Sequence, residues 1–151
     1  MKKTILIFAI LIVQVLLFSS FKSKTNSEKH SLTVEVNFLR NSKGHVQFSL
    51  YNKDGTVPDQ YFKYHIKQIN GKIIDESATV TFHNLEQGNY AVNILHDENK
   101  NGIIEKGWIL PIEGVGFTNY SDIGIMNRPN FKKASFHLNK NTTKTVKVIY
   151  M

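Results

Sequence analysis

Apolar residues alternate with polar ones in several short segments, and this period of two most constrains the fold. Residues 32–38 read Leu-Thr-Val-Glu-Val-Asn-Phe, and residues 45–50 read His-Val-Gln-Phe-Ser-Leu. Successive side chains of a strand point to opposite faces of a sheet, so each of these segments predicts a half-buried β-strand. Because no segment after residue 31 shows the 3.6-residue period of a helix, the chain is predicted to be all-β.

Turn-forming residues separate the predicted strands. Asn41 to Gly44 lies between the first two, so a hairpin is predicted there, and Asn70-Gly71 is the strongest short hairpin signal in the chain. A change of spacing at Asp75-Glu76 indicates a β-bulge. Residues 60–67 fit either a loop that packs its aromatic side chains or a short edge strand. Apolar runs predict further strands within 73–82, 91–95, 134–138 and 143–150.

The strand pattern predicts a β-sandwich. Leu85, Gly88 and Tyr90 have the spacing of a tyrosine corner, a device of Greek-key sandwiches. About seven short strands separated by turn signals predict an antiparallel Greek-key sandwich of the transthyretin-like or immunoglobulin-like kind. A chain of 151 residues is long enough to bury one core, so residues 32–151 are predicted to be a single domain.

The first 23 residues are typical of a secretory signal peptide. They combine a basic start, an apolar run from Ile5 to Leu17 and two serines, and the run is short of the about 20 residues that span a membrane. Phe18 and Phe21 make a poor cleavage site, so an uncleaved N-terminal anchor is the alternative. Both interpretations predict export to the periplasm, cell surface or medium. Residues 24–31 are polar and predict a flexible lead-in.

Cysteine is absent and positive charge is dispersed. Without cysteine there is no disulfide, no cysteine-ligated zinc and no thiol nucleophile. Leaving out Lys2 and Lys3, the 19 basic residues become 17 against 12 acidic ones, a net charge of +5. Nucleic-acid binding needs a concentrated basic stripe with stacking aromatic residues, which this sequence lacks. Nucleic acid is therefore not predicted as a partner, and no membrane span is predicted after the signal.

The segment 96–105, His-Asp-Glu-Asn-Lys-Asn-Gly-Ile-Ile-Glu, concentrates the polar chemistry of the chain. Oxygen-bearing side chains stand at alternate positions and Gly102 follows them, as at positions one, three, five and six of a calcium loop. Calcium is the one cofactor that this pattern indicates. The predicted metal ligands are Asp97, Asn99, Asn101, the carbonyl of Ile103, and Glu105.

The calcium pattern is incomplete. Position twelve of the loop is Trp108, where a bidentate glutamate would stand. Only two carboxylates then remain unless Glu98, Glu113 or Asp122 folds back, and a site with so few charges would bind calcium weakly. The alternative is a polar turn without metal, in which Asp and Asn side chains accept hydrogen bonds from their own backbone.

Several motifs resemble those of one bacterial family. They are His-Asp-Glu-Asn-x-Asn-Gly from His96, Pro-x-Glu-Gly-x-Gly-Phe-x-Asn over 111–119, and Pro-x-Phe over 129–131. The family is catalogued as domain of unknown function 2141, and the resemblance extends from about Leu32 to Tyr150. It implies an exported β-sandwich and no particular activity. Residues 120–127 depart from the family pattern, which weakens any ligand role for that part.

The long loop 96–131 is the predicted functional region, because binding residues gather on loops that a rigid scaffold positions. Its 107–120 part is suited to a glycan, a peptide or another envelope partner. Alternatively, its aromatic residues fold inward and the role is structural, and the burial of Trp108 and Phe117 discriminates between the two. The candidate ligand-binding residues are His96, Trp108, Glu113, Phe117 and Asn119.

Catalytic motifs are missing from the sequence. It contains no nucleophile elbow and no zinc-binding histidine spacing. Of the six histidines, His96 alone adjoins the polar segment, and a single histidine there more often forms structural hydrogen bonds than acts as a base. His45 begins a strand, and His65 lies in the ambiguous segment. We therefore predict a non-catalytic binding or structural module of the cell envelope in preference to a hydrolase.

Overall fold

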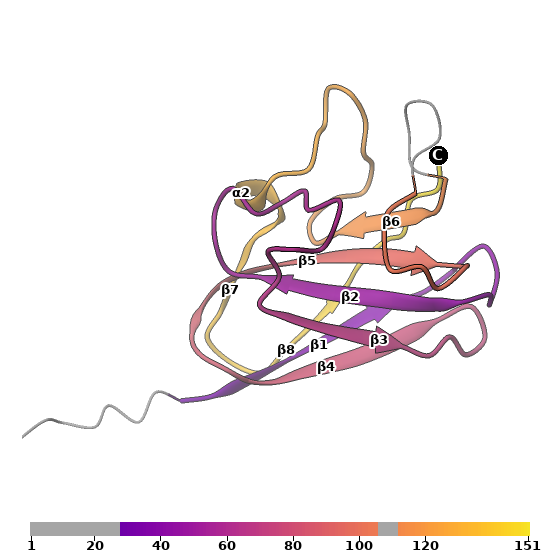
Figure 1. The fold of residues 1–151 in the computed structure, drawn as a ribbon. Helices are drawn as coiled ribbons and strands as arrows, with labels where there is room; N and C mark the ends of the chain where they lie inside the picture. Colours follow the sequence, from indigo (N-terminus) through magenta and orange to yellow (C-terminus); the bar gives the residue numbers. More distant parts are fainter. Residues whose placement is uncertain (1–27, 106–111) are drawn as a thin grey trace, which may run out of the picture.

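Two β-sheets pack face to face in the computed structural model, which describes residues 28–105 and 112–151 (Figure 1). The predicted signal peptide and Trp108 lie outside the described residues. The elements are β1 (His30–Val36), β2 (His45–Tyr51), β3 (Lys67–Gly71), β4 (Ala78–Leu85), β5 (Gly88–Asp97), β6 (Gly114–Phe117), α2 (Phe131–Ala134), β7 (Phe136–Leu138) and β8 (Thr142–Thr145).

One sheet has three strands and the other has five. The three-stranded sheet has the order β4-β1-β8, and the five-stranded sheet has the order β3-β2-β5-β6, with β7 paired to the first residues of β5. Neighbouring strands are antiparallel except β1 and β8, which run parallel. The predicted all-β sandwich is confirmed, with one parallel pair added to an otherwise antiparallel arrangement.

The main core lies between the two sheets and follows the alternation in the sequence. The apolar positions of β1 and β2 are fully buried there, together with Val92 and Ile94 of β5. The tyrosine corner is also confirmed, because the hydroxyl of Tyr90 donates a hydrogen bond of 2.9 Å to the carbonyl of Glu86. The residues of β1 and β2 in this core are Leu32, Val34, Val36, Val46, Phe48 and Leu50.

The predicted hairpin at residues 41–44 is wrong. β1 belongs to the three-stranded sheet and β2 to the five-stranded sheet, so the connection crosses from one layer to the other. The turn residues do reverse the chain, but β1 and β2 bury their apolar faces against each other across the core. A turn signal records a reversal of the chain and does not specify whether the flanking strands pair.

The predicted hairpin at Asn70-Gly71 is also wrong, because both residues lie inside β3, opposite Gln47 and Val46 of β2. Gly71 serves packing, since a Cβ at this position would lie 2.8 Å from the ring of Phe48. The chain reverses instead at the predicted bulge. Asp75 and Glu76 have φ of 48° and 55°, and Ile74 and Ser77 exchange two backbone hydrogen bonds across this tight turn.

The outer face of the five-stranded sheet is covered by loops, so β2 and β5 are buried on both faces. Segments 52–66, 98–105 and 118–131 form this third layer. Phe62 packs onto Leu95 there, which shows that segment 60–66 is a loop packing an aromatic side chain rather than an edge strand. Gln47, a polar residue on the outer face of β2, is therefore buried. The alternation of apolar and polar residues in the sequence predicted that it would contact water.

The remaining differences concern the ends of elements. β1 begins at His30, so the last two residues of the predicted lead-in belong to a strand. The predicted loop 96–131 contains the end of β5, all of β6 and the first residue of α2, a single helical turn. Over residues 28–105 and 112–151, no helix is long and apolar enough to cross a membrane.

Candidate functional site

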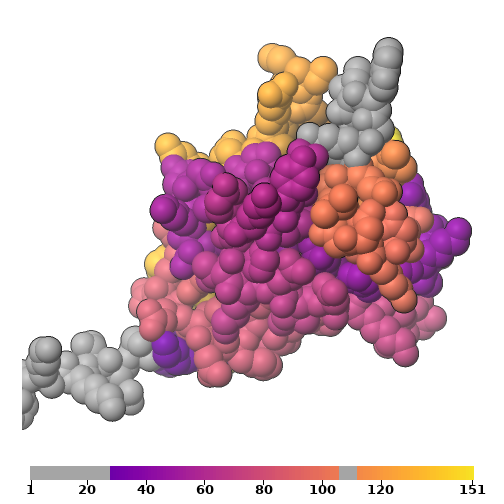
Figure 2. Space-filling view, viewed as in Figure 1, coloured from indigo at the N-terminus to yellow at the C-terminus, as the bar shows by residue number. Residues whose placement is uncertain are grey.

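A polar cleft of about 370 Å³ opens on the outer face of the five-stranded sheet. One wall comes from residues 61–65 and the other from the loop after β5, and these two segments lie next to each other on the molecular surface (Figure 2). The floor comes from β2 and β3. The lining residues are His45, Gln47, Tyr61, Phe62, His65, Gln68, Asn70, Asp97, Lys100, Asn101 and Gly102.

Strand pairing places the polar floor of the cleft. His45 and Gln47 are alternate residues of β2, so both side chains point to the outer face of the sheet. The register sets Asp97 of β5 opposite His45, and Asn70 of β3 opposite Gln47. Three strands that are far apart in the sequence thus deliver polar groups to one patch of the sheet.

Three buried nitrogen atoms of the cleft have no hydrogen-bond partner. They are Nε2 of His45, Nε2 of Gln47 and Nδ1 of His65, and Gln47 is only 1% exposed. An unsatisfied buried polar group costs about 1–3 kcal/mol, so native proteins retain few of them. A polar ligand or ordered water in the cleft would satisfy these atoms.

Asp97 closes the wall of the cleft that follows β5. Its carboxylate is fully buried and accepts hydrogen bonds from the backbone N–H groups of Asn101 at 3.0 Å and Gly102 at 2.8 Å. The Nε2 atom of His45 lies 3.5 Å from the same carboxylate. Asp97 therefore fixes the path of the loop and lies beside one of the cleft histidines without a hydrogen bond to it.

The other predicted calcium ligands bond within the loop. The side chain of Asn99 accepts from the N–H of Asn101, and that of Asn101 accepts from the N–H of Ile103 and donates to Glu105. These are the contacts of a self-bonded polar turn. Within the part of the chain that the structure describes, no group of three or more His, Cys, Asp or Glu side chains is arranged to hold a metal ion. The calcium ligand set stays a prediction.

A thermal melt separates the two interpretations of this loop. Because its own amides already close it, we expect the same melting temperature in millimolar calcium and in chelator. Calcium at about ten times the dissociation constant of a weak site would add about 1.4 kcal/mol to the free energy of unfolding. A calcium-dependent rise of several degrees that disappears with chelator would establish the metal site instead.

Glu113, the residue before β6, reaches the same loop. Its Oε1 atom accepts a hydrogen bond of 2.9 Å from the N–H of Glu98, while its Oε2 atom is buried without a partner. Burial raises the pKa of Glu113 above the usual 4.5, and the carboxylates of Asp97 and Glu105 raise it further against the opposing effect of the Glu98 N–H. The ionised side chain is therefore a cost to folding at neutral pH.

We expect the pH dependence of stability to reveal this cost. A carboxyl group whose pKa is raised on folding binds its proton more tightly in the native state, so the protein gains stability as the pH falls from 7 toward 4.5. Glu113→Gln lacks this gain, so its stability relative to the wild type should be greatest near pH 7 and fall at pH 5. Denaturant unfolding at several pH values measures the difference.

Glu86→Gln is the control for that experiment. Glu86 is exposed, and the hydrogen bond from Lys29 lowers its pKa below 4.5, so this variant and the wild type should change in parallel between pH 7 and pH 5 and diverge only below about pH 4.5. If Glu113→Gln and the wild type changed in parallel between pH 7 and pH 5, the raised pKa of Glu113 would be contradicted.

His96 lies on the opposite face of β5 from Asp97. It is fully buried, with Nδ1 2.7 Å from the hydroxyl of Tyr150 and Nε2 3.0 Å from the carbonyl of Lys43. A carbonyl can only accept, so Nε2 of His96 donates to it, and the Tyr150 hydroxyl bonds the other ring nitrogen. His96 thus forms structural hydrogen bonds, the role that the sequence favoured over that of a base. Its neighbour Asp97 is the residue that lines the cleft.

Phe117 and Asn119 hold the outer layer together. Phe117 is only 3% exposed and packs edge-on against Tyr120, so it is not a surface aromatic. The side-chain amide of Asn119 donates to backbone carbonyls at the end of α2. Of the predicted ligand-binding set, Phe117 and Asn119 line a second cleft, His96 and Glu113 line neither that cleft nor the polar cleft, and Trp108 lies outside the described residues.

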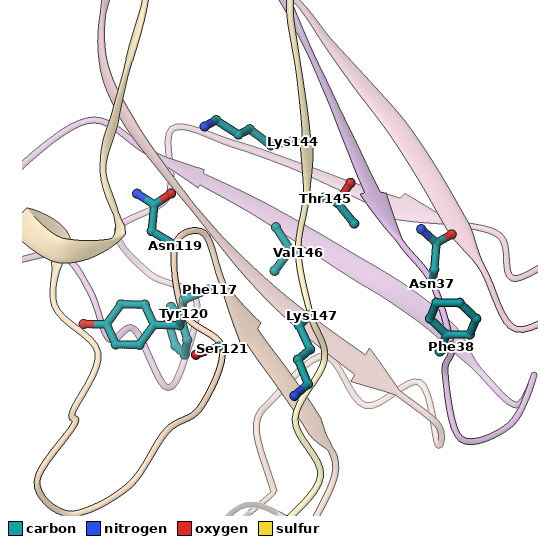
Figure 3. Close-up of a pocket in the computed structure, with 10 residues that line it drawn as sticks. All are labelled: Asn37, Phe38, Phe117, Asn119, Tyr120, Ser121, Lys144, Thr145, Val146 and Lys147. Atoms are coloured by element: carbon teal, nitrogen blue, oxygen red, sulfur yellow. The ribbon is translucent and has the colours of Figure 1, made fainter.

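This second cleft, of about 500 Å³, lies along residues 144–147, the end of β8 and the two residues that follow it. Figure 3 shows this segment running between Phe38 on one side and Asn119 and Tyr120 on the other. The unpartnered buried atoms found in the described residues are absent from its lining. It is therefore a weaker candidate for a ligand site than the polar cleft.

Comparison with known proteins assigns the family. The sequence profile of a family described as "Uncharacterized protein conserved in bacteria (DUF2141)" matches residues 34–146. The chain belongs to this family. No curated protein and no solved structure matches it. The match confirms the family that the sequence motifs of this DUF2141 protein had indicated. The family itself carries no established activity.

Sequence reasoning about this DUF2141 protein missed His45, Gln47, His65 and Tyr61. The expectation that His96 alone adjoins the polar segment is wrong, because His45 and His65 line the cleft and His96 faces away from it. One signal was present in the sequence: polar residues recur at every second position of β2. Their importance depends on the pairing of β2 with β3 and on the loops above, which the period does not specify.

Proposed function

We propose that this DUF2141 protein is an exported, non-catalytic module that binds a small polar ligand in the cleft above β2. The observation that carries the proposal is the convergence of three unpartnered buried nitrogen atoms, from His45, Gln47 and His65, on one cleft. A volume of about 370 Å³ is within the range of small-molecule sites. Export rests on the signal-like first 23 residues.

The lining of the cleft favours binding over catalysis. It contains no serine, threonine or cysteine that could act as a nucleophile. His45 has a carboxylate neighbour, but Asp97 is already committed to two backbone hydrogen bonds that hold the loop. The pair therefore acts in our proposal as a preorganised wall rather than as an acid–base couple.

The lining of the proposed site includes none of residues 112–120, the described part of the predicted binding segment 107–120. The burial of Phe117 supports the structural alternative for the β6 part of that segment, where the aromatic side chain seals the outer layer. The earlier part of the loop, 97–102, keeps its place in the function because it forms one wall of the cleft.

A ligand screen with a matched pair of variants tests the proposal. Purified mature protein is melted with glycosides, polyols, amino acids, small carboxylates and phosphate. One class should raise the melting temperature of the wild type and of Gln87→Met, whose glutamine is exposed at the other end of β5. Gln47→Met, which removes the buried amide, should lose the response. Identical responses of the two variants, or none with any class, would refute the cleft as a binding site.

A further inference from the structure

We infer that the ligand of the polar cleft is a neutral hydroxylated ring, such as one hexose unit, rather than an anion or a cation. This inference rests on the proposed function and specifies its ligand class. Three properties of the lining carry it: its charge, its hydrogen-bonding groups and its aromatic wall.

The fixed charges of the lining cancel. Lys100 is the lining residue with a permanent positive charge, and Asp97 carries the permanent negative charge. An anion seated against His45 would approach the buried Asp97 carboxylate, which lies 3.5 Å from the imidazole Nε2. A cation would have to approach the buried Nε2 amide of Gln47, whose hydrogen atoms are donors and repel positive charge, and the Asp97 carboxylate already accepts two backbone hydrogen bonds. An uncharged ligand avoids both costs.

The polar groups of the lining match hydroxyl groups. Four of the lining side chains are amides, from Gln47, Gln68, Asn70 and Asn101. Each amide side chain carries both donors and an acceptor, and each hydroxyl group can likewise donate and accept. A ring with several hydroxyl groups can therefore bond the unpartnered Nε2 of Gln47 while also engaging the amides around it.

An aromatic wall completes the cleft. Tyr61 is 59% exposed, and Phe62 beside it is buried against Leu95. The C–H face of a sugar ring is apolar, so it can pack on an exposed aromatic side chain while the hydroxyl groups bond to the floor. A carboxylate or phosphate ion would make no use of this wall.

The test compares neutral and charged probes on the same protein. Methyl glycosides of the common hexoses are titrated into ¹⁵N-labelled mature protein, with acetate and phosphate as the anion arm. We expect at least one glycoside to shift the side-chain amide signal of Gln47 in a saturable way, and neither anion to do so. A shift with the anions alone, or with another class from the ligand screen, would overturn this inference and leave the proposed function standing. No saturable shift with any class would overturn both.

Tyr61→Ala tests the aromatic wall, with Tyr64→Ala as its matched control. Tyr64 is 64% exposed in the same segment and does not line the cleft. Tyr61→Ala should weaken glycoside binding about tenfold, a loss consistent with removing one aromatic contact. Tyr64→Ala should leave the affinity unchanged. Equal affinities of the two variants would contradict packing of the ring on Tyr61.

Discussion

Gly44→Ala is expected to lower the free energy of unfolding by about 3–5 kcal/mol. Gly44 has a φ of +71°, a region that side chains other than glycine rarely adopt. A methyl group here would overlap the carbonyl oxygen of Asp97 and lie 2.6 Å from the Cα of Glu98. Both obstacles are backbone atoms, so the start of β2 and the end of β5 would have to separate at the edge of the cleft.

Gly55→Ala separates the two causes of that loss, which are the left-handed backbone conformation and the overlap of the new methyl group with backbone atoms. Gly55 has a φ of +79°, but a Cβ there would meet no other atom within 4 Å. Gly55→Ala should therefore lower the free energy of unfolding by only about 1–2 kcal/mol, which is what a left-handed backbone conformation costs an alanine. Urea denaturation of both variants measures the difference. Equal losses would mean that the close approach of Gly44 to Asp97 contributes nothing.

Asp97→Asn is expected to lower the free energy of unfolding by about 3 kcal/mol. The carboxylate accepts from two backbone N–H groups in a fully buried position. An asparagine replaces one acceptor oxygen with an NH₂ group, which then faces either the N–H of Gly102, whose acceptor is Asp97, or the N–H of Asn101, from which Asn99 also accepts. The loop 97–102 should then detach from the sheet, and the cleft should lose one wall.

Asp54→Asn is the matched control. Asp54 also accepts a hydrogen bond from a backbone N–H, that of Gly55, but it lies on the surface. Asp54→Asn should lower the free energy of unfolding by no more than about 0.5 kcal/mol, as for most surface substitutions. The loss at Asp97 should be the same in calcium and in chelator, because the loop is held by amides. A wild-type stability for Asp97→Asn would contradict the role of this carboxylate.

The period-two pattern predicted the sandwich correctly because it reflects burial on one face of each strand. Tyr90 was predictable for the same kind of reason, since the tyrosine corner depends on a local spacing. The pairing of strands was not predictable. Asn70-Gly71 has the residues of a hairpin turn but lies within β3, where the ring of Phe48 requires a glycine. Tertiary packing overrides the local turn preference there.

The candidate site was only partly predictable. The sequence identified Asp97 and its loop, because acidic and amide residues at alternate positions are visible without a structure. It did not identify His65 or Tyr61, which reach the cleft from a loop folded over the sheet. It also grouped His96 with Asp97, although adjacent residues of a strand point to opposite faces.

The stability of ligand-free Gln47→Met tests the central claim most directly, because a group kept for binding should be dispensable for folding. Methionine fills the space of the glutamine and removes the buried nitrogen that lacks a partner. Chemical denaturation should give a free energy of unfolding equal to or above that of the wild type, together with lost ligand binding. A loss of more than about 1.5 kcal/mol would instead show that the Gln47 amide supports the fold, and it would contradict the assignment of the cleft as a binding site.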